Sequence, residues 1–219
     1  MGSRKNLMRN YPVGKGRLSE RPIISEETRQ ISKRFDFDYF DGDRKYGYGG
    51  FNYNPRFWSD VVLDFINEYK LTEKSSILDI GCAKGFMLVD FKKVLPGITV
   101  SGLDISKYAI SSAHPDVKNY VIEGSAIKLP YEDKTFDLVI SINTLHNLKR
   151  NEIKKSLEEI NRVAKKYSFI MVDGYESESQ KEMMDKWVLT AETVLSYDEW
   201  IEFFNESKYL GDYDFWTVS

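Results

Sequence analysis

Hydrophobic residues follow two alternating patterns along the middle of the chain. Short, nearly continuous apolar runs are typical of buried strands, and between them lie segments whose apolar residues recur at helical spacing. The first pattern predicts strands at 76–80, 98–104, 119–123, 136–141 and 168–173. The second predicts helices at 54–69, 84–95, 106–113 and 152–165.

The alternation of strands and helices predicts the class of fold. Parallel strands are joined by right-handed crossovers, and strands that are apolar along their whole length are buried on both faces of a sheet. We therefore expect an α/β fold with a doubly wound, mostly parallel, Rossmann-like sheet of six to seven strands and helices on both faces.

The C-terminal part has a weaker pattern. Residues 178–187 and 197–207 predict two helices, and Ser196 has the position of a helix cap before the second. Residues 213–218 predict a last strand. Only one strand-like segment follows the second helix, so either the sheet ends in a shortened hairpin or residues 188–194 supply a further strand.

The composition of the N-terminal part changes near residue 30. Residues 1–30 are polar and broken by prolines, which predicts a flexible arm; an arm that folds over the active site or a partner chain is the alternative. Residues 31–54 are crowded with aromatic residues and glycines, which predicts an aromatic lid. We expect residues 31–219 to form a single domain, in which residues 174–196 are an insertion on the substrate side.

Charge and cysteine content narrow the class of function. The formal net charge of the 219 residues is −3, so no basic field attracts nucleic acid. Cys82 is the only cysteine, which excludes an internal disulfide and fits a reducing compartment. No apolar run has the length of a membrane-spanning helix or the form of a signal peptide, so we expect a cytoplasmic protein. Its oligomeric state is open, and a homodimer is one option.

A glycine-bounded loop follows the first predicted strand. The segment Asp79–Gly85 has the pattern D-x-G-x-x-x-G, and it matches neither the dinucleotide fingerprint nor the P-loop. Gly81 and Gly85 allow the backbone to approach a ligand closely. Asp79 places an acid where a phosphate would need positive charge, so a hydroxylated or cationic ligand is favoured over a polyphosphate. A plain strand-to-helix turn is the alternative.

Three more loops leave the same predicted edge of the sheet. Asp104 ends the second strand, where an acid can accept hydrogen bonds from a ribose diol; a helix cap is the alternative. The segments 123–126 and 142–147 follow the third and fourth strands. Ligands of open α/β sheets bind at the carboxyl edge, so these four loops together predict a site.

With these four motifs the chain resembles the class I S-adenosylmethionine-dependent methyltransferases, over roughly residues 55–173. The resemblance implies S-adenosylmethionine as cofactor, S-adenosylhomocysteine as its product, and no metal ion. It also implies a set of contacts: Asp79 near the amino group of the cofactor, Gly81, Cys82, Ala83 and Gly85 around its methionine part, Asp104 on the ribose, Ile105, Ser125 and Ala126 beside the adenine, and Asn143 at the passage to the substrate.

Two observations narrow the class of molecule that accepts the methyl group. The chain lacks certain motifs, and it has a second resemblance. It lacks the signatures of DNA, catechol and arginine methylation. The segments 46–51, 186–191 and 198–200 look similar to a bacterial group associated with surface-polysaccharide synthesis, which implies methylation of a sugar hydroxyl. Tyr46 or Tyr48 would then contact the sulfonium through cation–π attraction. Methylation of nitrogen or phosphate oxygen on a small molecule, and binding without catalysis, are the alternatives.

Two residues are candidates for the base that a hydroxyl acceptor requires. His146 titrates near neutral pH and follows the fourth strand, and Asp173 ends the fifth strand at the same edge. A structural histidine at the start of the next helix is the alternative for His146.

Overall fold

A parallel sheet of seven strands forms the centre of the structure, a computed structural model that describes residues 2–12, 24–49 and 51–218. The strands are β1 (Ser76–Ile80), β2 (Thr99–Asp104), β3 (Val121–Glu123), β4 (Phe136–Ile142), β5 (Ala164–Tyr175), β6 (Leu195–Ser196) and β7 (Asp212–Trp216). Their spatial order is β3-β2-β1-β4-β5, and both β6 and β7 pair with β5. The predicted doubly wound, mostly parallel sheet is therefore confirmed.

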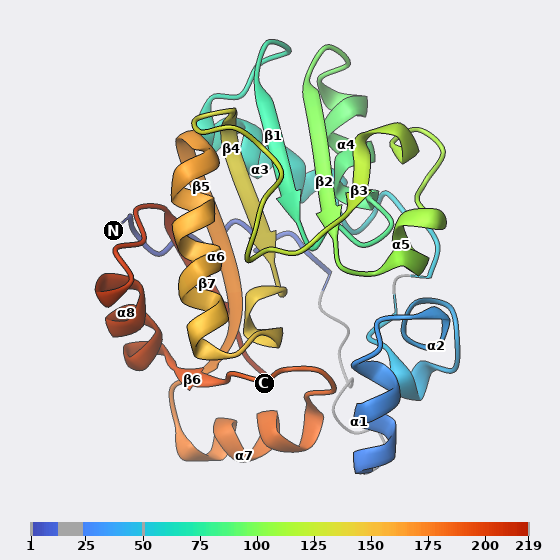
Figure 1. Ribbon diagram of the computed structural model, residues 1–219, viewed down its shortest axis with the longest axis vertical. Helices are drawn as coiled ribbons and strands as arrows, with labels where there is room; N and C mark the ends of the chain where they lie inside the picture. Colours follow the sequence, from blue (N-terminus) through green and yellow to red (C-terminus); the bar gives the residue numbers. More distant parts are fainter. Residues whose placement is uncertain (1, 13–23, 50, 219) are drawn as a thin grey trace.

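Helices cover both faces of the sheet. They are α1 (Glu26–Ser32), α2 (Phe37–Phe40), α3 (Ser59–Tyr69), α4 (Phe86–Val94), α5 (Lys107–Ser111), α6 (Arg150–Val163), α7 (Glu178–Trp187) and α8 (Tyr197–Glu206), with 3₁₀ turns at Arg44–Tyr46, Lys118–Tyr120 and Leu145–Asn147. One hydrophobic cluster packs α3 and α4 against the sheet, and a second cluster packs α6 and α8 against the opposite face. Figure 1 shows α6 in front of the sheet and α3 and α4 behind it.

The end of the chain resolves the alternatives that the sequence left open. Residues 188–194 are described and form no strand, and β7 joins β5 in parallel, so there is no final hairpin. The predicted cap of α8 is present: the amide of Glu199 donates to Oγ of Ser196, and the amide of Ser196 donates to Oε2 of Glu199 at 2.8 Å. The helix predicted from residue 54 begins instead at Ser59, because residues 55–58 form a turn.

The N-terminal segment differs from the expected flexible arm. Residues 2–12 run beside β7, where the amide of Lys5 donates to the carbonyl of Tyr213 at 2.9 Å and Arg4 forms a parallel bridge with the same residue. Leu7 is buried in the cluster under α3 and α4. The edge strand β7 has unpaired backbone groups that favour such an added segment. Residues 13–23 of the predicted arm lie outside the described residues, and α1 follows them.

We predict that Leu7→Ala lowers the free energy of unfolding by about 2–5 kcal/mol, because it removes a buried aliphatic side chain and leaves a cavity. Leu210→Ala is the matched control, because Leu210 is 67% exposed. Chemical denaturation of both variants measures the difference. Equal stability of the two variants would show that residues 2–12 do not pack on the sheet in solution.

Candidate active site

The loop after β1 requires glycine at two positions. Gly81 has φ +81°, and a Cβ atom there would lie 1.9 Å from Oγ1 of Thr144. Gly85 has φ +76°, and its Cβ would lie 2.7 Å from Cγ2 of Val117. Both positions therefore combine left-handed backbone with no room for a side chain. The contact with Thr144 also joins the loop after β1 to the loop after β4, a neighbour that sequence reasoning missed.

The Asp104 carboxylate fastens the first two loops together. Its Oδ2 accepts a hydrogen bond from the amide of Ala83 and its Oδ1 accepts one from the amide of Ser106, both at 2.8 Å. The cap of α5 is Ser106, whose Oγ accepts from the amide of Ala109. A carboxylate offers roughly four acceptor positions, so Asp104 keeps capacity for two hydroxyl donors after making these bonds.

Asp79 is a buried carboxyl group with an acid as its neighbour. Asp79 is 6% exposed. Its burial and the nearby charge of Asp104 raise the pKa of its carboxyl group to about 7. Within the described parts of the chain no lysine, arginine or histidine forms an ion pair with it. An ammonium group bound beside Asp79 would supply the missing positive charge.

The third loop lies beside Asp104, as predicted. The amide of Gly124 donates to the carbonyl of Asp104 at 2.8 Å, which brings Ser125 and Ala126 to the same edge. Ala126 is 9% exposed, whereas the apolar side chain of Ile105 is 59% exposed. The expected contacts of these residues with adenine stay a prediction.

The loop after β4 is fixed against β5. Asn143 adopts φ +52°, and its amide donates to the carbonyl of Met171 at 2.9 Å. The next residue, Thr144, contacts Gly81 of the glycine loop. Asn143 thus lies between the glycine loop and β5. This is the placement expected for a residue at the passage to the substrate, and the contact itself stays a prediction.

His146 and Asp173 form a buried pair whose geometry favours a structural role for the histidine. Nδ1 of His146 accepts from the amide of Asp173 at 2.9 Å, so the ring proton is on Nε2, which faces Oδ2 of Asp173 at 3.5 Å. Burial lowers the pKa of His146 and raises the pKa of Asp173. A general base needs a lone pair within reach of its substrate, and the lone pair on Nδ1 is already used. The catalytic role of His146 therefore stays a prediction that this geometry does not favour.

Residues 31–54, the predicted lid, are attached to the glycine loop by a lysine that sequence reasoning missed. Lys84 is 5% exposed, and its Nζ pairs with the carboxylate of Asp41 and donates to the carbonyl of Phe51 at 2.8 Å. The hydroxyl of Tyr108 on α5 donates to the same Asp41 at 2.7 Å. Lys84 and Asp41 carry no spacing signal, because 43 positions separate them in the sequence.

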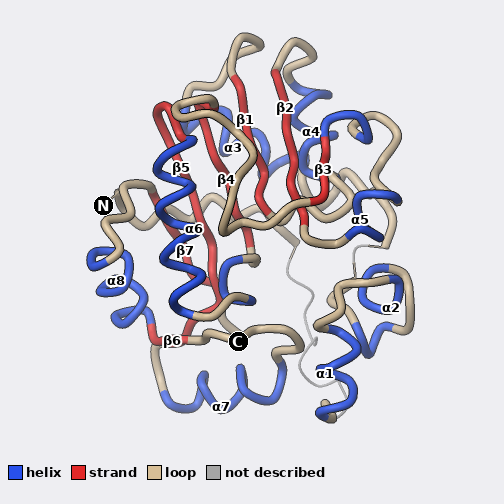
Figure 2. The backbone as a smooth tube through the Cα atoms, viewed as in Figure 1, coloured by secondary structure: helices blue, strands red, loops and turns tan. Residues whose placement is uncertain are grey.

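The other side of the lid is attached to the segment after α7. The hydroxyl of Tyr48 accepts from the amide of Leu189 at 2.7 Å, and its ring stacks on Trp187 with centroids 4.9 Å apart. Arg29 on α1 donates to the carbonyls of Asp185 and Val188. Figure 1 shows α1, α2 and α7 at the end of the sheet toward which the strand arrows point, and Figure 2 shows the same arrangement of the backbone. Tyr48 thus contacts the segment after α7, and its expected contact with a sulfonium stays a prediction.

Comparison with known proteins identifies the type of domain. The profile of the methyltransferase domain family matches residues 78–172. The chain is 34% identical over 134 residues to a tRNA (carboxymethyluridine(34)-5-O)-methyltransferase of Arabidopsis thaliana, covering 60% of this chain and 31% of that protein. It is 33% identical over 125 residues to norajmaline N-methyltransferase of Rauvolfia serpentina, covering 53% and 42%. The chain thus spans less than half the length of both relatives.

A solved structure agrees in fold. The YcgJ protein of Bacillus subtilis superimposes with a TM-score of 0.55 at 19% identity, covering 67% of this chain and 66% of that one. Residues 78–172 form a methyltransferase domain of the class I, S-adenosylmethionine-dependent type. The residues fit that cofactor: Asp79 has no positively charged partner among the described residues, Asp104 has free acceptor capacity, and the glycine loop has no side chains at Gly81 and Gly85.

Two further features of the described residues bear on the class of site. No group of histidine, cysteine, aspartate and glutamate side chains among them is arranged to hold a metal ion. None of the helices that the structure describes is long and apolar enough to cross a membrane.

We predict that S-adenosylhomocysteine binds about tenfold more tightly at pH 8 than at pH 6, because its ammonium group requires the ionised form of Asp79. Asp79 has a pKa of about 7 in the free protein, so it is mostly protonated at the lower pH and mostly ionised at the higher. Calorimetric titration across this range measures the effect. Asp79→Asn should bind weakly at both pH values, and a pH-independent affinity of the unmodified protein would contradict this role.

We also predict that Lys84→Met speeds amide hydrogen exchange in residues 35–51, because it removes both attachments of the Lys84 ammonium to the lid. Lys107→Met, at an exposed position on α5, is the control and should leave exchange in this segment unchanged. Mass spectrometry of peptides from the lid provides the measurement. Identical exchange in the two variants would mean that Lys84 does not hold the lid.

Proposed function

We propose that this protein is an S-adenosylmethionine-dependent O-methyltransferase that acts on a hydroxyl group of a sugar or a sugar-linked small molecule, in bacterial surface-polysaccharide synthesis. The observation that carries the proposal is the convergence of Asp79, Asp104 and the glycine loop at one edge of the sheet. When bound there, S-adenosylmethionine would supply an electrophilic methyl group.

The residues of the chain would contribute mainly by positioning. Asp79 would hold an ammonium group, and Asp104 would accept hydrogen bonds from ribose hydroxyls while it fixes the amide of Ala83. The lid, attached through Lys84 and Tyr48, would exclude water from the edge of the sheet. Fixing two reactants in line can supply effective molarities of about 10⁵–10⁸ M, which is a large share of the acceleration that such a displacement needs.

The character of the lid and the net charge support a small acceptor. A net charge of −3 gives no field that attracts RNA, although one relative carries the name of a tRNA methyltransferase. Aromatic side chains such as Tyr48 and Trp187 form the attachment of the lid to the substrate side. Aromatic rings with polar tips suit sugar rings, which present both apolar faces and hydroxyl groups.

The acceptor hydroxyl must lose a proton, and Asp173 is the better of the two candidate bases. Burial raises its pKa, which makes its carboxylate a stronger proton acceptor when ionised. His146 would act as a positioning residue, since it holds the amide of Asp173.

Methylation of an amine is the second candidate reaction. An amine acceptor needs no general base, and both candidate bases, His146 and Asp173, are buried. The relative named norajmaline N-methyltransferase acts, by that name, on nitrogen.

Transfer of labelled methyl groups to matched panels of glycosides and amines tests the proposed reaction directly. We expect product only with the glycosides, and product only with the amines would favour the second reaction. Failure of S-adenosylhomocysteine to bind in calorimetry would remove the proposal as a whole.

We predict that Asp104→Ala weakens S-adenosylhomocysteine binding about 100-fold, because charge-assisted hydrogen bonds are lost and the amide of Ala83 is released. Asp116→Ala is the control, because its carboxylate is 60% exposed and pairs with His114, which belongs to none of the four loops. Circular dichroism should show that both variants are folded. An unchanged affinity in Asp104→Ala would remove the ribose role of this carboxylate.

A further inference from the structure

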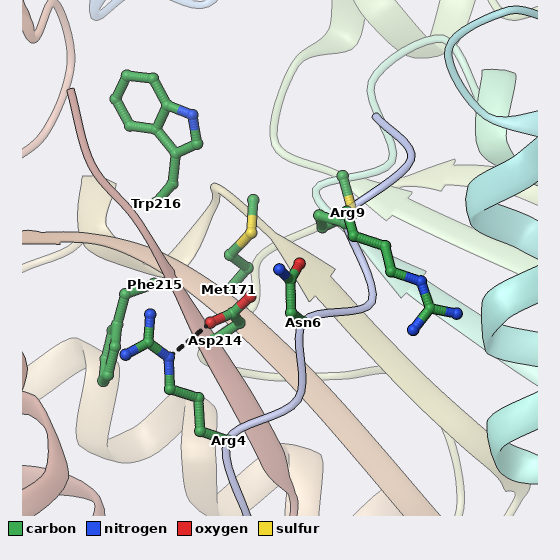
Figure 3. A pocket seen from close by; sticks show the side chains of 8 residues that line it. Arg4, Asn6, Arg9, Met171, Asp214, Phe215 and Trp216 are labelled. Carbon is green, nitrogen blue, oxygen red and sulfur yellow. Dashed lines mark hydrogen bonds and ion pairs between the residues drawn. The ribbon is translucent and has the colours of Figure 1, made fainter. Parts of the chain in front are cut away.

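A cavity of about 590 Å³ lies between the N-terminal segment and the carboxyl halves of β5 and β7. This is within the usual range for small-molecule sites, about 300–1,000 Å³. Figure 3 shows its lining: one wall comes from residues near the N-terminus, the other from the two strands. The residues that matter here are Arg4, Asn6, Arg9, Met171, Asp214 and Trp216.

The charges of this cavity are already balanced. Nε of Arg4 pairs with Oδ1 of Asp214 at 2.9 Å, and the guanidinium of Arg4 lies over the ring of Tyr197, 4.8 Å from its centroid. Arg9 pairs with Asp64 on α3. Because each cation has its own carboxylate, the cavity offers hydrogen-bonding groups without an unpaired positive charge. It therefore suits a neutral polar ligand better than a phosphate.

The cavity is next to the reactive end of the cofactor site. Met171, which lines it, pairs with Ile142 across β4 and β5, and its carbonyl accepts from the amide of Asn143. Neighbouring strands are about 4.8 Å apart. The cavity therefore begins one strand away from the loop after β4, whose Thr144 contacts Gly81.

An aromatic stack joins the cavity to the lid. Trp216 lies against Trp187, with ring centroids 4.8 Å apart, and Trp187 stacks on Tyr48. Trp216 is also a lining residue, so a ligand in the cavity would contact one end of the stack. The other end belongs to the lid above the glycine loop.

We propose that this cavity is the acceptor site and that it takes a neutral, polyhydroxylated ring such as a pyranose. Trp216 packs against the apolar face of the ring, the Asp214 carboxylate accepts hydrogen bonds from its hydroxyl groups, and the Asn6 amide donates to them or accepts from them. The N-terminal segment is then a wall of the active site. This inference rests on the proposed methyl transfer, which requires an acceptor beside Asn143.

Indole N–H signals in a ¹⁵N correlation spectrum report on the site even before the natural acceptor is identified. The chain has four tryptophans, so the signals of Trp216, Trp187 and Trp200 can be assigned by substitution with Phe. The probes are the methyl glycosides of glucose, galactose and mannose, added to the protein saturated with S-adenosylhomocysteine. We expect shifts at Trp216 and Trp187 and none at Trp200, which is fully buried and donates to the carbonyl of Asp173.

Asn6→Trp should abolish these shifts by filling the cavity, whereas Asn119→Trp, at an exposed position far from it, should preserve them. Affinity for S-adenosylhomocysteine should stay within about twofold in both variants, because neither residue belongs to the four loops. No shift at Trp216 with any glycoside, while S-adenosylhomocysteine still binds, would overturn the acceptor site and leave the proposed cofactor function standing. A shift at Trp216 with inorganic phosphate alone would overturn the neutral-ring assignment.

Discussion

The hydrogen bond from the amide of Ala83 to the Asp104 carboxylate is the interaction on which the site depends. It ties the loop after β1 to the end of β2, and the second oxygen of the same carboxylate fixes the amide of Ser106 at the start of α5. Parallel pairing brings the loops to one edge, but pairing alone leaves their backbones free to vary. The carboxylate removes that freedom, and it does so before any ligand arrives.

In the ligand-free protein, the negative charge of two acidic side chains at this edge of the sheet is only partly compensated by positive charge. Asp79 and Asp104 are both buried, and burial raises the pKa of each. The pKa of Asp79 rises from 3.8 to about 7, so the folded protein holds this proton to a higher pH than the unfolded chain does. Stability contributed by the protonated group is therefore lost as pH rises from about 4 through about 7. A bound ammonium group would reverse that loss, which links cofactor binding to the stability of the fold.

Elements and loops formed by residues close together in the sequence could be predicted from it. Contacts between segments far apart in the sequence could not. The bounds of β1 and α7 agree with the strand predicted at 76–80 and the helix predicted at 178–187, and in β1 the apolar run is also buried. Gly81 and Asp104 could be recognised because strand ends and left-handed glycines have sequence signatures. The pair Lys84–Asp41 and the wall formed by Asn6 have no such signature, since each depends on two segments that meet only in the folded chain.

The dependence on distant contacts also explains why the sequence alone does not assign a role to His146. A histidine after the fourth strand has the intrinsic pKa of a base, but its chemistry depends on what its two nitrogens contact. Here Nδ1 accepts from the amide of Asp173, and the backbone carbonyl of His146 accepts from the amides of Glu192 and Thr193. One residue thus joins the loop after β4, the strand β5 and the segment after α7. Because that segment also carries the attachment of Tyr48 at Leu189, the position of the lid depends on this buried histidine.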